Sequence, residues 1–170
     1  MSGFVEGLRE VYFEDDGVIP NSGLPVLMYR GVLKDRLGDV EAVFNGNRWL
    51  NSWVNGVFGY HHYHSNSHEV LGVVSGEVTV QLGGEQGQAF TLVAGDVVVL
   101  PAGTGHKRLE ASEDFRIVGA YPGGISYNTR TGEPGEYEQA LGEIPQVPLP
   151  DTDPVFGVDG PLVRLWRGEN

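Results

Sequence analysis

Four side chains of the kinds that bind transition metals stand out in the sequence: His62, His64, Glu69 and His106. Residues two positions apart point to the same face of a β-strand, so His62 and His64 would present their imidazoles together. A carboxylate and a third imidazole beside them would complete a site of the kind that holds Fe, Mn, Ni, Zn or Cu. The sequence therefore predicts a divalent transition metal as the cofactor, with these four side chains as its ligands.

Three neighbouring residues leave alternatives open. His68 directly precedes Glu69 in the sequence and would replace a ligand if the bend before it shifted register. His61 alternates with the ligand row, so its side chain is predicted to face away from the metal. Glu110 has the same parity as His106 along a strand, so it either faces the site or lies exposed at the end of that strand.

The segments around these residues have the pattern of short β-strands joined by turns. Residues 77–82 alternate polar and apolar side chains, as a half-buried strand does, whereas residues 97–100 form a continuous apolar run. Glycine-rich stretches such as 83–87 are typical of hairpin turns. Only residues 38–45 fit a short helix. The predicted strands are 25–32, 70–74, 77–82, 89–93, 97–100 and 115–121.

The chain has 170 residues, the length of one ordinary domain, and is predicted to fold as a single domain over residues 1–170. The core barrel is expected at about 25–121. Prolines are frequent after residue 121, so regular elements are not expected over 122–161. The segment 122–170 is expected to wrap over the barrel, and residues 162–166 to add a closing edge strand.

Composition excludes several classes of partner. The formal net charge is −12, and the 11 Lys and Arg residues are scattered, so nucleic acid and anionic membrane surfaces are not expected partners. There is no cysteine, which excludes disulfides and thiolate metal sites. The sequence shows neither a signal peptide nor an apolar stretch of membrane-spanning length, so a cytoplasmic protein is expected.

The ligand-type residues fall within two spaced motifs that resemble the signatures of the cupin superfamily. The first motif is met in full by Gly56, His62, His64, Glu69 and Gly76. The second is met by Gly95, Pro101, Gly103 and His106, with Glu110 where asparagine is usual. The segments HHYHSNSHEVLGV and GDVVVLPAGTGHK are similar to those of small, single-domain bacterial cupins of uncharacterised function, and the likeness extends over nearly the whole chain.

This resemblance implies an all-β fold, a single antiparallel jelly-roll barrel (a double-stranded β-helix) with the metal at one end. It also implies a homodimer, because cupins commonly pair through the strand edges of the barrel. The superfamily supports many chemistries, so the motifs alone do not name a reaction.

A metal-dependent enzyme acting on a small organic molecule is the leading functional hypothesis. Four protein ligands leave an octahedral ion two positions for substrate and dioxygen, which favours an oxygenase. A divalent ion and one carboxylate carry a net charge of +1, which favours an anionic or enolisable substrate. The alternatives are a non-catalytic module that binds a sugar or small acid, an isomerase or lyase in which Glu69 or Glu110 moves a proton, and a storage-like barrel. Trp53, Phe58 and Tyr60 would either line the barrel mouth or belong to the core.

Overall fold

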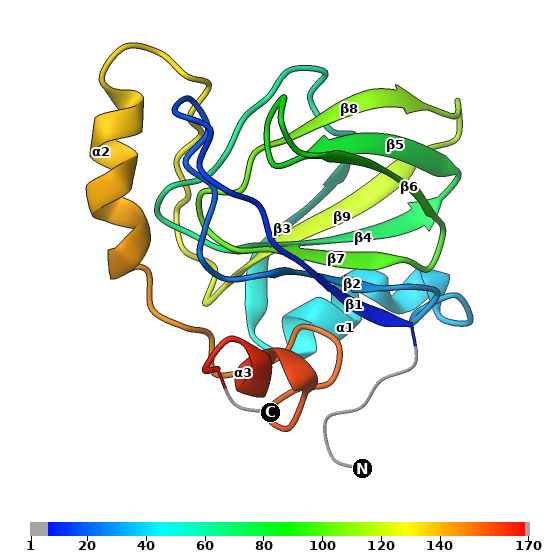
Figure 1. The fold of residues 1–170 in the computed structure, drawn as a ribbon. Coiled ribbons are helices and arrows are strands. Elements are labelled where there is room, and N and C mark those ends of the chain that lie inside the picture. Colours follow the sequence, from blue (N-terminus) through cyan, green and yellow to red (C-terminus); the bar gives the residue numbers. More distant parts are fainter. Residues whose placement is uncertain (1–6, 169–170) are drawn as a thin grey trace.

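The computed structural model describes residues 7–168 as two antiparallel sheets that face each other (Figure 1). The six-stranded sheet has the order β1 (Leu8–Val11), β2 (Val26–Tyr29), β7 (Val97–Leu100), β4 (Glu69–Ser75), β9 (Arg116–Pro122) and β3 (Trp49–Asn55). The three-stranded sheet has the order β6 (Gln88–Val93), β5 (Glu77–Leu82) and β8 (His106–Ala111). The predicted fold, a mostly β structure of antiparallel jelly-roll type, is confirmed.

The main core lies between the two sheets. β5 shows why: Val78, Val80 and Leu82 are buried, while the residues between them are partly exposed. Successive side chains of a strand point to opposite faces, so this alternation places one apolar row inward. Leu71 and Val73 of β4 belong to the same buried cluster. The interior between the sheets is therefore apolar along most of its length.

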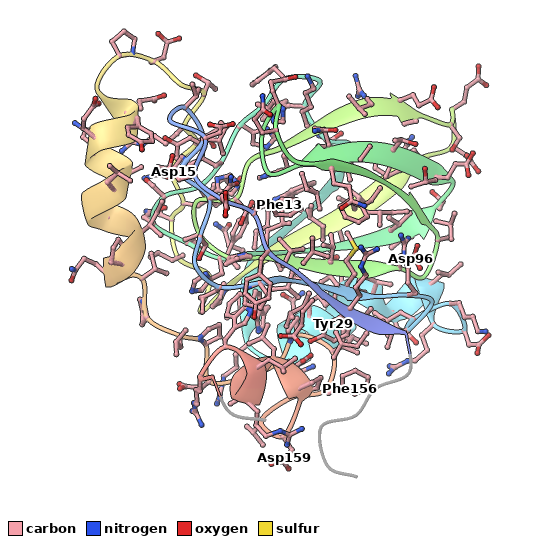
Figure 2. All side chains as sticks on the ribbon, viewed as in Figure 1. Phe13, Asp15, Tyr29, Asp96, Phe156 and Asp159 are labelled. Atoms are coloured by element: carbon pink, nitrogen blue, oxygen red, sulfur yellow. The ribbon has the colours of Figure 1, made fainter. Side chains whose placement is uncertain are left out.

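A second core covers the outer face of the six-stranded sheet. All four residues of β2 and all four of β7 are buried, because the inner face packs in the barrel and the outer face lies under helices. Phe44 of α1 (Val40–Gly46) and Leu162 of α3 (Pro161–Leu165) belong to this outer cluster. Figure 2 shows Tyr29 and Phe156 on this side of the molecule, where their rings stack at 6.0 Å.

The helices differ from the sequence prediction. The predicted helix at 38–45 is present as the 3-10 turn η1 (Leu37–Asp39) followed by α1. The prediction that 122–161 lacks regular elements is wrong, because α2 (Glu136–Glu143) and the 3-10 turn η2 (Ile144–Gln146) lie there. The edge strand predicted at 162–166 is also wrong, because α3 occupies it. Within residues 7–168, no helix has the length and apolarity needed to cross a bilayer.

The frequent prolines after residue 121 were misleading because they lie at helix starts and in connections. Pro161 opens α3, a position where a missing backbone N–H costs nothing. The Glu136 carboxylate begins α2 by accepting hydrogen bonds from the amides of Thr131, Gly132 and Glu133 at 2.8–3.0 Å. The start of α2 is therefore stabilised by hydrogen bonds to the preceding loop, which proline content does not reveal.

The C-terminal segment is tied to the barrel through Asp153, which is fully buried. Its carboxylate accepts backbone hydrogen bonds from Val155 at 2.8 Å, Phe156 at 3.0 Å and Leu162 at 3.1 Å. The hydroxyl of Tyr29 on β2 donates a further hydrogen bond to it. One side chain thus joins a loop, α3 and the six-stranded sheet.

Two strands bound the six-stranded sheet, β1 and β3. On β3, Leu50 and Val54 are 38% and 51% exposed, so an apolar part of this edge faces solvent. An exposed sheet edge is a surface through which two chains can pair. The homodimer expected from the sequence stays a prediction, because the structure holds a single chain.

Candidate metal centre

His62 and His106 reach the site from two segments that lie side by side. The amide of His62 donates to the carbonyl oxygen of His106 at 3.1 Å, and the reverse hydrogen bond measures 3.0 Å. The strand predicted through His62 and His64 is reduced to isolated bridges at His62 and Tyr63. His106 opens β8 opposite Leu82 of β5, so the three-stranded sheet fixes its position.

The turn that precedes β8 also supports His64. The amide of Gly103 donates to the carbonyl oxygen of His64 at 2.8 Å. Gly103 has a φ of 95°, in the left-handed region that glycine adopts without strain. A Cβ at this position would also press on the backbone oxygen of Asn21. The geometry therefore gives a physical reason for the glycine of the second motif.

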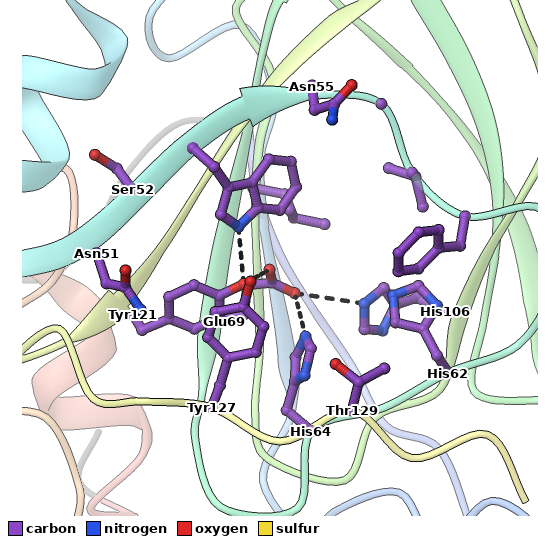
Figure 3. Close-up of a pocket in the computed structure, with 15 residues that line it drawn as sticks. Asn51, Ser52, Asn55, His62, His64, Glu69, His106, Tyr121, Tyr127 and Thr129 are labelled. Atoms are coloured by element: carbon purple, nitrogen blue, oxygen red, sulfur yellow. Dashed lines mark hydrogen bonds and ion pairs between the residues drawn. The ribbon is translucent and has the colours of Figure 1, made fainter.

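Glu69 begins β4 opposite Leu100 and is buried between the sheets. Its Oε1 lies 3.3 Å from Nε2 of His64 and 3.4 Å from Nε2 of His106. Its Oε2 accepts a hydrogen bond of 2.7 Å from the hydroxyl of Tyr121. Figure 3 shows the carboxylate of Glu69 directed toward His64 and His106, with Tyr121 behind it. The structure thus brings all four sequence-predicted site residues to one place.

Each of the three imidazoles is oriented through its other ring nitrogen. Nδ1 lies within hydrogen-bonding distance of a backbone carbonyl oxygen in every case: 3.2 Å for His62, 2.5 Å for His64 and 3.0 Å for His106. A carbonyl only accepts, so Nδ1 carries a proton, and in the neutral imidazole Nε2 is left with a lone pair. One ring nitrogen from each histidine lies within 4.8 Å of the others. This is the arrangement by which proteins fix metal-binding histidines.

Burial and neighbouring charges set the protonation of the site. Burial, followed by the His106 ring, lowers the pKa of His62 to about 3, so this imidazole is neutral at pH 7. Burial raises the pKa of Glu69, but His64 and His106 outweigh it and hold the pKa below its usual range. Burial lowers the pKa of His64, but the Glu69 carboxylate outweighs it and raises the pKa overall. A metal ion would therefore compete with a proton at His64.

The donor set fits a divalent cation. Oε1 of Glu69 is buried, and it accepts no hydrogen bond of good geometry from any residue between 7 and 168. When the imidazoles are neutral, three nitrogen lone pairs and one carboxylate oxygen face a common space and repel one another unless a proton or a metal ion lies between them. A buried polar atom without a partner is costly, and a bound cation would remove that cost. The buried triad of His62, His64 and His106 can hold a metal ion; Glu69 as the fourth ligand stays a prediction.

The alternatives left open by the sequence lie elsewhere. His68 is buried outside the triad, where its Nδ1 accepts the amide of Ala102 at 2.9 Å and its Nε2 lies 3.2 Å from the carbonyl oxygen of Pro148. Its ring also packs 4.8 Å from that of Trp166, so it supports the C-terminal segment. His61 lies 3.1 Å from Glu85 and is not part of the triad, as predicted for a residue that faces away from it.

Glu110 is exposed, because a bulge in β8 changes the parity on which its inward orientation depended. Arg108 pairs with Val80, but Glu110 rather than Leu109 pairs with Thr79. The extra residue turns Glu110 to the outer face, where Thr79 also points. The alternative in which Glu110 faces the site is therefore wrong.

A cavity of about 430 Å³ opens onto the four site residues. Its remaining wall combines aromatic, small apolar and uncharged polar side chains: Asn51, Ser52, Trp53, Asn55, Gly56, Val57, Phe58, Leu71, Tyr121, Tyr127 and Thr129. Of the three aromatic residues predicted either to line the barrel mouth or to belong to the core, Trp53 and Phe58 line the cavity. Tyr60 does not line it and stacks on Phe58 at 5.0 Å. Sequence reasoning missed Tyr127 and Thr129, since they follow β9 in a segment without strand or helix periodicity.

Two consecutive hydrogen bonds, from Trp53 to Tyr121 and from Tyr121 to Glu69, hold Oε2 of Glu69 in place. The indole N–H of Trp53 donates to the hydroxyl of Tyr121 at 2.9 Å, and that hydroxyl donates to Glu69. Burial and the Glu69 charge raise the pKa of Tyr121, so its hydroxyl stays protonated and remains a donor. Gly119 leaves room for the indole, because a Cβ there would overlap the Trp53 ring. These two hydrogen bonds hold Oε2 away from the space that Oε1 faces (Figure 3).

Replacing Tyr121 with phenylalanine is expected to weaken metal binding about tenfold, as loss of a group that orients a ligand typically does. The ring and its packing are kept, so unfolding by urea should change little. Tyr63→Phe is the matched control, because the Tyr63 hydroxyl is buried and no residue in the described part of the chain bonds it. Titration with a competing chelator measures both variants. Equal affinities would show that Tyr121 does not orient Glu69.

Comparison with known proteins is consistent with this geometry. The cupin domain family matches residues 52–118, which contain all four site residues. The uncharacterized protein YjlB of Bacillus subtilis (strain 168) is 48% identical over 156 residues, covering 91% of this chain and 94% of that protein.

Two solved structures show weaker likenesses. The WlaRB TDP-quinovose 3,4-ketoisomerase from Campylobacter jejuni is 16% identical, with a TM-score of 0.42, covering 53% of this chain and 72% of that one. Acireductone dioxygenase from Bacillus anthracis with a cadmium ion in its active center is 19% identical, with a TM-score of 0.37, covering 52% and 58%. These scores carry no argument about the reaction of this chain.

Proposed function

This chain belongs to the cupin superfamily, and on that premise we propose that it is a metal-dependent enzyme, oxygenase-like, that acts on a small organic molecule. The proposed ligands are His62, His64, Glu69 and His106. One observation carries the proposal: Oε1 of Glu69 is buried without a hydrogen-bond partner in residues 7–168 and lies 3.3–3.4 Å from two imidazole nitrogens, beside a cavity. When bound, a redox-active divalent ion would supply the dioxygen chemistry that these side chains lack.

The residues of the chain would prepare the site for that ion. The three carbonyl acceptors at Nδ1 keep the imidazoles in one tautomer, so their lone pairs need no reorganisation. Glu69 contributes one negative charge, which leaves the ion and its ligands at net +1. Tyr121 donates to Oε2 and so restrains the carboxylate in one orientation. The cavity gives a small molecule access to this prepared centre.

The cavity wall favours oxygenation over isomerisation or elimination. Outside the ligand set, the only titratable side chains that line it within residues 7–168 are Tyr121 and Tyr127. The raised pKa of Tyr121 makes it a poor base near neutral pH. An isomerase or lyase would need a free base to move a substrate proton, and the exposed Glu110 is not one. The same observation keeps a non-catalytic binding module as the second candidate.

Oxygen uptake tests the proposal. The protein is loaded in turn with Fe(II), Mn(II), Ni(II) or Cu(II) and offered small acids, diketones and phenols. At least one metal form is expected to consume oxygen with one of them and release a product, while the metal-free protein consumes none. Ligand-dependent thermal stabilisation without any product, for every metal, would instead establish the binding module, because ligand binding to the folded state raises its apparent stability.

A further inference from the structure

The cavity presents aromatic rings on two sides of the four site residues. The rings of Tyr121 and Tyr127 stack at 4.1 Å with an angle of 21°, and Tyr127 meets the His64 ring edge-on at 4.9 Å. Phe58 meets the His62 ring edge-on at 5.1 Å, and it is 52% exposed at the mouth. Phe58 and the tyrosine pair all line the cavity, so a molecule bound there can contact aromatic rings. Such walls favour a flat ring, because aromatic rings attract each other through stacked and edge-to-face contacts.

The same wall lacks a partner for a separate anionic group. None of the side chains that line the cavity in the described residues is a lysine or an arginine. Of the bases on neighbouring segments, Lys107 pairs with Glu85 at 2.9 Å and Arg130 pairs with Glu143 at 3.4 Å. Arg108 lines a separate pocket on the other side of Asn55 and Gly56. A carboxylate, sulfonate or phosphate on the ligand would lose water without gaining a counter-charge, which is costly.

Uncharged hydrogen-bonding groups complete the wall. Asn55 and Thr129 contribute an amide and a hydroxyl to the lining. Asn51 and Ser52 also line it, but their side chains bond the carbonyl oxygen of Ile125 and the carboxylate of Glu41. Hydroxyl or carbonyl oxygens on a ligand would find partners here, at low cost and without a net charge.

From these three properties we infer that the substrate is a small planar ring, a phenol or a ring-shaped enol. Its only acidic group is the oxygen that would bind the ion held by the four ligands. This inference rests on the proposed metal-dependent function, and it adds that the rest of the substrate is uncharged. The net charge of +1 at the centre favours that one oxygen as an anion, and the aromatic walls hold the ring.

The experiment measures a selectivity ratio by calorimetry on the Zn(II)-loaded protein, because Zn(II) is not redox-active and binding occurs without turnover. The ratio is the affinity for catechol divided by that for cyclohexane-1,2-diol, a non-planar diol. Comparing variants cancels the metal's own preference for catechol. The ratio is expected to fall about tenfold in Tyr127→Leu and to stay within about twofold of wild type in Tyr127→Phe, which keeps the ring. Phe58→Leu, at an exposed position, gives the same test if Tyr127→Leu does not fold.

A ratio unchanged by both leucine variants would overturn the inference. So would a preference for 4,5-dihydroxybenzene-1,3-disulfonate over catechol that is greater on the Zn(II)-loaded protein than for free Zn(II), since this diol adds two charges that the wall is inferred to disfavour. Failure of the proposed function is seen separately, as protein that binds no metal by elemental analysis. In that case, the affinity of the metal-free protein for phenol, divided by its affinity for cyclohexanol, still decides whether the cavity walls select a planar ring.

Discussion

Replacing His106 with alanine is expected to lower the affinity for a divalent ion more than about 100-fold, because it removes a nitrogen that faces the ion, whereas loss of an orienting group alone costs 10–100-fold. Nε2 of His106 lies 3.4 Å from Oε1 of Glu69, and its Nδ1 is already bonded to the carbonyl oxygen of Thr104. No other histidine within residues 7–168 joins His62 and His64 in the triad, so none can take its place. Competition with a chelating dye measures the affinity.

Two histidine variants are the controls for this loss. His61→Ala should keep wild-type affinity, because His61 is directed toward Glu85 and is not part of the triad. His68→Ala should also keep it but lower the free energy of unfolding, because it removes the link between Ala102 and Pro148. Equal metal contents in His106→Ala and His61→Ala would refute the ligand assignment. A loss in His68→Ala as large as in His64→Ala would restore His68 as a ligand.

The Asp153→Ala variant is expected to lose about 4 kcal/mol of unfolding free energy, because two buried and two part-buried donors lose their acceptor and each buried donor left unpaired costs about 1–3 kcal/mol. Those donors are the amides of Val155, Phe156 and Leu162 and the hydroxyl of Tyr29. The loss would loosen α3 from the outer face of the six-stranded sheet. Urea unfolding followed by tryptophan fluorescence measures the change.

Asp151→Ala is the matched control, because Asp151 is exposed only two residues away. Its unfolding free energy should lie within about 0.5 kcal/mol of wild type. The metal affinity of Asp153→Ala, measured where the variant remains folded, should be close to wild type because Asp153 does not line the cavity. If Asp153→Ala were as stable as Asp151→Ala, the C-terminal segment would not depend on this carboxylate.

Most of the strands in the described residues could be predicted from the sequence, because alternating or continuous burial produces a periodic pattern of apolar residues. The strands β1 and β3 were not among those predicted. The alternation over residues 77–82 and the apolar run over 97–100 correspond to β5, with one buried face, and β7, buried on both faces. The four site residues were found for a related reason: their spacing is fixed by the turns that connect the strands. Gly103 shows this, since its left-handed backbone and its close approach to Asn21 admit no side chain.

The features that could not be predicted depend on contacts that produce no periodic sequence pattern. α2 begins where the Glu136 carboxylate binds three amides, a local arrangement hidden among prolines and glycines. A single extra residue in β8 turned Glu110 outward, and no sequence pattern marks that bulge. Tyr127 reaches the cavity from an irregular segment, through its stack on Tyr121. Such residues are placed by tertiary packing, so a parity argument cannot find them.

Diffraction from crystals of protein purified without chelator, recorded at the absorption edge of the metal identified by elemental analysis, tests the central claim most directly. The account predicts one ion per chain, with Nε2 of His62, His64 and His106 and Oε1 of Glu69 at about 2.0–2.3 Å. An ion bound elsewhere would contradict it. The account would also be contradicted if no metal bound at this site after loading with each candidate metal, and Glu69 and the imidazoles shared only protons.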